Sequence, residues 1–166
     1  RPNQEQLAVL EAVMRRCAVE AREERQDKAK RSSAEPLRAM VQGLPGAGKS
    51  KVVKWMRLFF ETVLGWQHGV EFVCLTSQNT MAALIGGFTL HSWGAIPINL
   101  EAANTARQQK WDKAQIDHLW LRCQSLRWLI VDEISTVAAE IFAALDINLR
   151  QAIRQQGTYA VRPDGT

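Results

Sequence analysis

One eight-residue segment, Gly43–Ser50, carries the clearest chemistry in this 166-residue sequence. It reads Gly-Leu-Pro-Gly-Ala-Gly-Lys-Ser, the GxxxxGK[ST] pattern of a phosphate-binding loop. Glycines let such a loop curl until its backbone N–H groups point at phosphate oxygens. Lys49 supplies a charge for the outer phosphates, and the Ser50 hydroxyl suits Mg²⁺. The pattern predicts a site for ATP and Mg²⁺, and its nucleotide-binding candidates are Gly43, Gly46, Ala47, Gly48, Lys49 and Ser50.

A second group of chemical interest is the acidic pair Asp132 and Glu133, which follows the apolar run Trp128–Val131. Ligands of parallel sheets bind at the carboxyl ends of the strands, where such a pair would lie. Asp132 is the candidate to hold Mg²⁺, directly or through water. Glu133 is the candidate to orient and deprotonate the water that attacks the terminal phosphate. The predicted catalytic residues are therefore Lys49 and Glu133.

The elements that must position these residues alternate between strands and helices. Apolar and β-branched runs predict strands at residues 37–42, 70–75 and 128–131. Apolar spacing of three or four predicts helices at residues 3–25, 51–64, 79–85, 111–123 and 138–153. We expect Asn79 to cap its helix and Gly86 to end it. Residues 89–93 are ambiguous, and 99–110 read as a surface loop or a loosely held helix. The alternation predicts a parallel sheet covered by helices.

Composition excludes several other classes of protein. Hydrophobic residues make up 46% and charged residues 23%, as in globular domains. No apolar run approaches the roughly 18 residues that span a bilayer, so no membrane partner is expected. Three widely spaced cysteines predict neither a disulfide framework nor a metal site, which favours a reducing compartment. Residues 1–60 hold 13 basic and 7 acidic side chains, a balance that permits an anionic partner. The start at Arg1 and the turn-like end predict a piece of a longer chain.

Four segments in order resemble the first RecA-like domain of the Pif-type DNA helicases of superfamily one, relatives of RecD and of helitron helicases. The resemblance covers roughly residues 3–155. Two of the segments are Asn3–Gln6, similar to an adenine-reading segment, and the phosphate loop. The other two are similar to single-strand-contacting segments and to an aspartate–glutamate–isoleucine–serine motif. They lie at Leu75–Ser77 with Ala82–Ala83 and Gly86–Ser92, and at Leu129–Ser135.

The resemblance implies an α/β, RecA-like P-loop NTPase domain at residues 37–166. An N-terminal helix, an adenine-contacting segment and a charged linker would precede it at residues 1–36. It implies a motor that couples Mg-ATP hydrolysis to movement on single-stranded DNA and to unwinding at duplex junctions, in DNA repair, recombination or telomere maintenance. Gln6 would contact adenine. A second RecA-like domain, absent from this chain, would complete the motor. The resemblance places such a protein in the nucleus or the mitochondrion. The implied DNA-contacting residues are Thr76, Thr89, His91, Ser92 and Trp93.

Other interpretations remain open at the level of sequence. The chain could be another P-loop NTPase, although the guanine-reading Asn-Lys-x-Asp segment of GTPases is absent and a kinase does not need Glu133. It could also be a non-hydrolysing nucleotide- or DNA-binding remnant of a helitron-like element. Residues 77–81 lack the family's usual small-residue run, and Trp93 stands where Phe is usual. The polar groups near Thr89 could cap a helix and Trp93 could be core. Packing is also the simplest explanation of Trp55, and His68 is expected at the surface.

Overall fold

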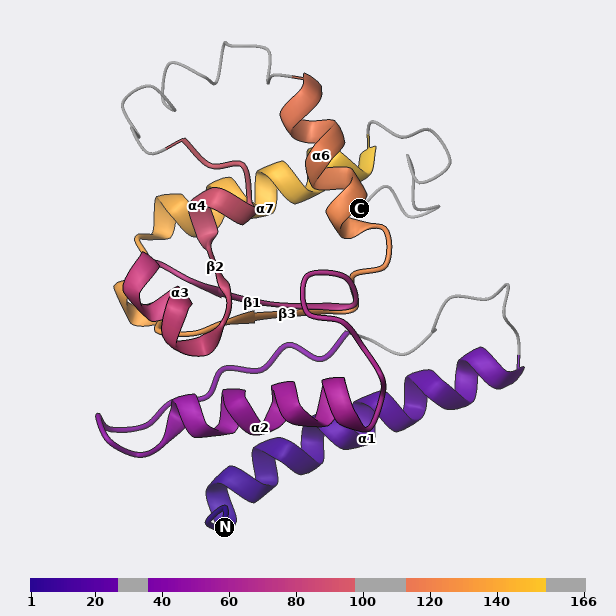
Figure 1. Ribbon diagram of the computed structural model, residues 1–166, viewed down its shortest axis with the longest axis vertical. Helices are drawn as coiled ribbons and strands as arrows, with labels where there is room; N and C mark the ends of the chain where they lie inside the picture. Colours follow the sequence, from indigo (N-terminus) through magenta and orange to yellow (C-terminus); the bar gives the residue numbers. More distant parts are fainter. Residues whose placement is uncertain (27–35, 98–112, 155–166) are drawn as a thin grey trace. The chain divides into compact units, whose positions relative to one another are not determined.

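The computed structural model describes residues 1–26, 36–97 and 113–154 (Figure 1). Its contacts divide the chain into two compact units, Arg1–Phe59 and Phe60–Thr166. The division falls within helix α2 (Lys49–Thr62). The domain boundary expected after residue 36 rests on the resemblance and stays a prediction. The predicted loop at residues 99–110 lies outside the described residues.

The first unit contains α1 (Gln4–Gln26) and most of α2. The apolar residues Leu10, Val13 and Cys17 form the buried stripe of α1, which confirms the helix predicted over residues 3–25. Asn3 and Gln6 bond reciprocally at the start of this helix. The Gln6 N–H donates to Asn3 Oδ1 (2.8 Å), and the Asn3 N–H donates to Gln6 Oε1 (3.0 Å). This capping box satisfies N–H groups that have no acceptor within the helix, and it holds the Gln6 side chain in place.

The strand predicted at residues 37–42 is not formed, and that prediction is wrong. Residues 36–44 have no regular secondary structure and are not among the three strands of the sheet. The apolar side chains of Leu37, Met40 and Val41 are 39%, 66% and 44% exposed. A strand depends on a neighbouring strand for its hydrogen bonds and on a covered face for its side chains, and this segment has neither here.

The second unit is built on a parallel sheet of order β2-β1-β3, formed by β1 (Phe72–Thr76), β2 (Phe88–Thr89) and β3 (Trp128–Val131). Leu75 pairs with Phe88 and with Val131, so the carboxyl ends of the three strands come together. The parallel α/β architecture predicted from the sequence is therefore present. β1 is central and fully buried, as expected for a strand covered on both faces.

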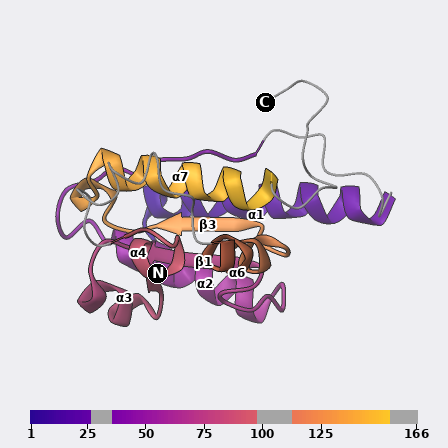
Figure 2. The ribbon, with the colours of Figure 1, turned by 90° about the horizontal axis from the view of Figure 1, so that it is seen from above.

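Helices α3 (Asn79–Ile85), α4 (Leu90–Trp93), α6 (Lys113–Cys123) and α7 (Ala139–Arg154) complete this unit, with a 3₁₀ turn at Ile134–Thr136. Figure 2 shows α7 running along the direction of β3. The core joins Val73 and Leu75 of β1 to residues of α4, α6 and α7, among them Leu90, Leu119 and Leu145. On the other side of β1, the Phe72 ring lies 5.0 Å from the Phe60 ring. None of the described helices is both long and apolar enough to cross a membrane.

Two local predictions need correction, although the bounds of α3 match the predicted helix. Asn79 is the first helical residue and Gln78 is the N-cap, without a side-chain bond, so Asn79 does not cap the helix. Gly86 ends it in the left-handed conformation (φ 61°), as predicted. His68 is not a free surface residue. Its Nε2 accepts from the Cys74 N–H (3.1 Å), and its ring stacks on Phe88 at 5.3 Å.

Candidate nucleotide and nucleic-acid sites

The loop Gly43–Ser50 has the backbone geometry that its glycines predict. Gly46 and Gly48 adopt φ values of 81° and 83°, a region that side chains with a Cβ rarely enter. Within the loop, the Ala47 N–H donates to the Leu44 carbonyl (3.1 Å). In the described part of the chain, the N–H groups of Gly46 and Gly48 have no backbone acceptor. The loop therefore retains donors for a ligand, and its last two residues, Lys49 and Ser50, are the first two of α2.

The Lys49 side chain lies back across this loop. Its Nζ donates to the carbonyl oxygens of Gly43 (2.9 Å) and Leu44 (3.3 Å). Ammonium groups are point charges with three rotatable donors, so these contacts hold the amine at the loop without fixing one ligand geometry. A phosphate in the loop would meet this charge. Ser50 lies in the first turn of α2 and is partly buried.

Gln6 is attached to the phosphate loop. Its Nε2 donates to the carbonyl of Ala47 (2.9 Å), while its Oε1 accepts from Asn3 in the capping box. An amide has two N–H donors and two oxygen lone pairs, and these bonds use one of each. One N–H donor and one lone pair remain, and these are the groups with which a Gln amide pairs to adenine N7 and N6. The geometry is compatible with the adenine-reading role implied by the resemblance.

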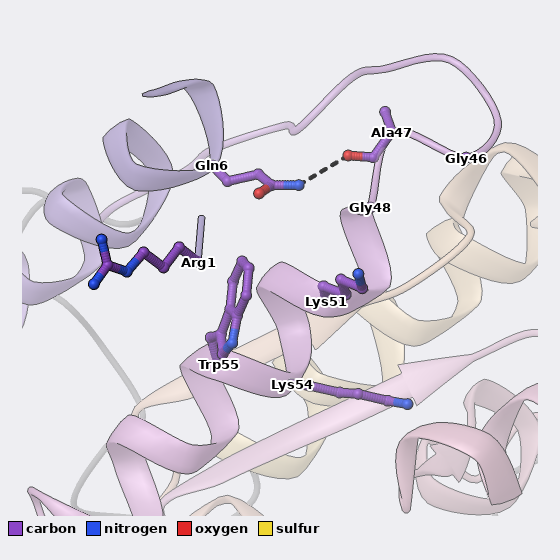
Figure 3. Close-up of a pocket in the computed structure, with 8 residues that line it drawn as sticks. All are labelled: Arg1, Gln6, Gly46, Ala47, Gly48, Lys51, Lys54 and Trp55. Atoms are coloured by element: carbon purple, nitrogen blue, oxygen red, sulfur yellow. Dashed lines mark hydrogen bonds between the residues drawn. The ribbon is translucent and has the colours of Figure 1, made fainter. Parts of the chain in front are cut away.

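A cavity of about 370 Å³ opens beside Gln6 and the loop (Figure 3). All of its described lining residues belong to the first unit. The basic ones are Arg1, Lys51 and Lys54, and no carboxylate is among them. A concave site with several cations favours an anionic ligand. The remaining lining residues are Gln6, Gly46, Ala47, Gly48 and Trp55. The sequence predicted packing for Trp55, and its place in the cavity wall was not foreseen.

In the second unit, Asp132 and Glu133 follow β3 at the carboxyl edge of the sheet. The Asp132 N–H donates to the Leu75 carbonyl (2.8 Å), which ties the acidic pair to the end of β1. Glu133 has φ 54°, which is uncommon for a residue with a side chain. Its carbonyl accepts from Thr136 Oγ1 (2.8 Å), and that hydroxyl shares a 2.6 Å hydrogen bond with Ser77 Oγ. These bonds hold the left-handed conformation of Glu133 in place.

The donor set predicted for Mg²⁺ suits that ion chemically. Mg²⁺ prefers oxygen ligands and is commonly held by one or two carboxylates together with substrate phosphates. Asp132 is 8% exposed, and its Oδ1 accepts from the Glu133 N–H (3.0 Å). Its Oδ2 has no hydrogen-bond donor among the described residues, so one carboxylate oxygen remains available. Within the same residues no group of three His, Cys, Asp or Glu side chains could hold a metal ion without help.

The predicted DNA-contacting residues at the ends of β1 and β2 differ in accessibility. Thr76 is fully buried, and its Oγ1 has no partner within the described chain. Thr89 is 9% exposed and caps α4, since its Oγ1 accepts from the Ser92 N–H (3.1 Å) and donates to Ser92 Oγ (2.9 Å). His91 is partly exposed and Ser92 is exposed. In this structure the Thr89 hydroxyl therefore serves the capping role that the sequence had left open.

Trp93 corrects a prediction more sharply. It is 2% exposed and belongs to the core with Leu90 and Leu145, so its ring offers no face to a base. The turn after it is held from two helices. Arg122 donates to the carbonyls of Ser92 (3.0 Å) and Trp93 (2.7 Å), and Asn148 donates to those of Gly94 (2.8 Å) and Ala95 (3.1 Å). Trp93 is a packing residue of this turn.

An aromatic side chain that the sequence analysis missed lies one residue before Thr89. Phe88 is 42% exposed and borders a cavity of about 180 Å³ with Gly69, Ser92, Trp93 and Arg122. One face of its ring stacks on His68, which the Cys74 N–H holds in place. Position 88 lies within the segment Gly86–Ser92 that resembles the family motif, but it is not among the residues that the resemblance implied as DNA contacts. The alternation of side chains along a strand, which places Thr89 inward and Phe88 outward, is the signal that points to it.

Comparison with known proteins agrees with this arrangement of motifs. Residues 26–163 match the family model of the PIF1-like helicases, and the chain belongs to this family. A curated relative, the ATP-dependent DNA helicase PIF6 of Trypanosoma brucei brucei (strain 927/4 GUTat10.1), is 27% identical over 106 residues. These residues are 64% of the chain described here and 12% of the relative. The chain thus spans a small part of the length of the curated relative it matches. No solved structure matches it significantly.

Proposed function

We propose that this chain is the first RecA-like domain of an ATP-dependent DNA helicase, which couples Mg-ATP hydrolysis to translocation on single-stranded DNA and to duplex unwinding. The observation that carries the proposal is the loop Gly43–Ser50, with its two left-handed glycines and its lysine across the loop, in a member of the PIF1-like helicase family. The parallel sheet with an acidic pair at its carboxyl edge supports the same assignment.

Phosphoryl transfer needs positioning and neutralisation of charge more than covalent chemistry. In the proposed site the loop N–H groups hold the phosphates, and the Lys49 amine exchanges its carbonyl partners for phosphate oxygens. Ser50 and Asp132 would hold Mg²⁺ through hydroxyl and carboxylate oxygens. When bound, this ion would neutralise the developing charge on the phosphates. Gln6 would contribute its free amide edge to the adenine.

Glu133 is the proposed general base. It would accept a proton from the attacking water, whose oxygen forms a bond to the terminal phosphorus while the bond from that phosphorus to the bridging oxygen breaks and ADP leaves. A residue with a side chain at φ 54° is strained, and such strain persists only when surrounding contacts hold it. The contacts of the Glu133 carbonyl with Thr136 supply that support. These contacts fix the backbone from which the Glu133 side chain projects, next to Asp132.

For single-stranded DNA, we propose contacts from the accessible groups beside β2. The His91 imidazole suits hydrogen bonds to phosphate oxygens, as does the Ser92 hydroxyl once it releases the Thr89 carbonyl (3.2 Å). The Arg122 guanidinium adds a positive charge. The exposed ring of Phe88 takes the stacking role that the sequence had given to Trp93. Binding of this kind is blind to sequence and falls with salt. Thr76 and Thr89 would contribute only if their burial and capping changed on binding.

A second RecA-like domain is part of the proposal, because cationic groups from it would complete the charge neutralisation at the phosphates. We expect the chain alone to hydrolyse ATP slowly. Work on DNA in repair, recombination or telomere maintenance, in the nucleus or the mitochondrion, is proposed from family membership.

Hydrolysis of ATP under single-turnover conditions, with the chain in excess and single-stranded oligothymidine present or absent, tests the proposal. Oligothymidine should raise the rate. Glu133→Gln should abolish hydrolysis while it retains ATP affinity, because the amide keeps the shape of the side chain and removes the base. Glu140→Gln, an exposed carboxylate on α7, is the matched control and should leave the rate unchanged. Hydrolysis by Glu133→Gln at the parental rate would show that Glu133 is not the base.

A further inference from the structure

The indole of Trp55 is a feature of the first unit that the proposed function does not use. Trp55 projects from α2 into the cavity beside the phosphate loop, and Gln6 of α1 enters the same space (Figure 3). The side chain is only partly buried, so an aromatic surface remains open to the cavity. The indole of Trp55 is thus less covered than that of Trp93, which is 2% exposed.

The place of Trp55 along α2 matches the distance at which a nucleobase would lie. Trp55 follows Ser50 by five residues, or about 7.5 Å along the helix axis. In a nucleoside triphosphate, a ribose and the α-phosphate separate the base from the outer phosphates. The cavity extends from the loop residues Gly46–Gly48 to Trp55, so a nucleotide that follows it from the loop would carry its base to the indole. Lys51 lies one turn before Trp55 on the same face of α2, and it lines the same cavity.

The other walls of the cavity suit a nucleotide as well. Lys51 and Lys54 supply positive charge, and the described lining residues include no carboxylate to oppose it. The Gln6 amide keeps one donor and one lone pair after its bonds to Asn3 and Ala47. The cavity volume of about 370 Å³ is within the range of about 300–1,000 Å³ typical of small-molecule sites.

From these observations we infer that Trp55 forms the stacking wall of the nucleotide site, against which the face of the base packs. This inference rests on the proposed nucleotide site and adds a residue that neither the phosphate loop nor the acidic pair contains. Trp55 and Gln6 then have separable roles. The indole binds any base, because every base has an aromatic face, whereas the Gln6 amide distinguishes adenine from guanine by hydrogen bonds.

Calorimetric titrations of the 166-residue chain with ATP, GTP and inorganic tripolyphosphate, each with Mg²⁺, test the inference. Trp55→Leu should weaken ATP and GTP binding by about the same factor, on the order of tenfold, and leave tripolyphosphate binding unchanged. Trp55→Phe should restore most of the loss. Gln6→Leu should instead reduce the preference for ATP over GTP. Leu58→Ala, which removes an exposed apolar side chain of the same helix, is the matched control and should change none of these affinities.

The outcomes separate the inference from the function on which it rests. If the wild-type chain binds tripolyphosphate and ATP equally well, the phosphate site stands and the stacking wall is wrong. If it binds neither, both are wrong. If Trp55→Leu weakens tripolyphosphate binding as much as ATP binding, Trp55 is a packing residue.

A second measurement needs no destabilising variant. The indole N–H resonance of Trp55, assigned by its loss in Trp55→Phe, should shift with ATP and stay in place with tripolyphosphate, and the absence of an ATP-specific shift would overturn the inference.

Discussion

The phosphate loop and the turn Thr89–Ala95 are both short polar segments that resemble family motifs, yet they use their polar groups in opposite ways. In the loop, Gly46 and Gly48 leave N–H groups without backbone acceptors in the described structure. In the turn, Thr89 caps α4, and Arg122 and Asn148 bond to the carbonyls of residues 92–95. The loop keeps its hydrogen-bonding capacity for a ligand, whereas the turn uses most of it to hold its own shape.

This difference shows what a motif match can and cannot assign. A phosphate loop works through backbone N–H groups that its glycine spacing exposes, so the pattern alone predicts which groups would contact a ligand. The turn works through side chains whose availability depends on burial. Its motif residues therefore divide into those that stabilise the turn, such as Thr89 and Trp93, and those whose side chains remain accessible, such as Phe88 and His91.

The largest expected effect concerns the two aromatic residues of this region. Trp93→Ala should destabilise the chain by about 3–5 kcal/mol, because it removes a fully packed indole from the core. Phe88→Ala should cost less than half as much, since its ring is 42% exposed, and should lower the affinity for labelled oligothymidine. Urea unfolding and fluorescence anisotropy measure the two quantities. Equal destabilisation by both substitutions would contradict the assignment of Trp93 to packing and of Phe88 to the surface. A loss of DNA affinity with Trp93→Ala at unchanged stability would contradict it as well.

A smaller effect is expected at two glycines of the phosphate loop. Gly46→Ala and Gly48→Ala should each cost about 1–2 kcal/mol, because both positions have positive φ. Only at position 48 would the new methyl group also lie 2.6 Å from Gln6 Nε2, whereas the space at Gly46 is open. Gly48→Ala should therefore displace the Gln6 amide and lower the preference for ATP over GTP. Gly46→Ala is the control. If both variants lose the preference for ATP over GTP to the same extent, the contact between position 48 and Gln6 does not set that preference.

The elements of the fold were largely predictable from sequence, because local spacing decides them. Helix 79–85 and strand 128–131 have the bounds that their apolar patterns indicate. The segment 37–42 has the same local signal without a partner strand, and a sequence pattern carries no information on the partner. The burial of Trp93 likewise depends on Leu145 and on the turn held by Asn148, more than fifty residues away.

Some features of the candidate site were predictable from local sequence, and others were not because they depend on contacts between distant residues. The glycine geometry of the phosphate loop and the position of Asp132 after β3 follow from local sequence. The double role of Gln6, which caps α1 and bonds to Ala47, joins residues 41 positions apart. The place of Trp55 in the cavity wall depends on α1 as well as α2. Contacts of this kind come from tertiary packing, which apolar periodicity does not describe.

The smallest expected effect is a pH dependence beside the turn. Burial raises the pKa of the Cys123 thiol from 9.0 to about 11, against the opposing charge of Arg122. The folded chain thus favours the neutral thiol, and this contribution to stability is complete below pH 9 and is lost as the pH rises through 11. The difference in unfolding free energy between the wild type and Cys123→Ala should shrink across that window. A difference independent of pH would show that the thiol is as accessible as in the unfolded chain.

The central claim is that the loop Gly43–Ser50 binds the phosphates of a nucleotide and that Lys49 is its main cation. Calorimetric titration of Mg-ATP into the wild type, Lys49→Ala and Lys54→Ala tests it directly, with circular dichroism as a check on folding. The account predicts binding by the wild type, loss of binding in Lys49→Ala and most of the affinity retained in Lys54→Ala, whose cation lines the cavity beside the loop. Equal affinity of the wild type and Lys49→Ala for Mg-ATP would contradict it.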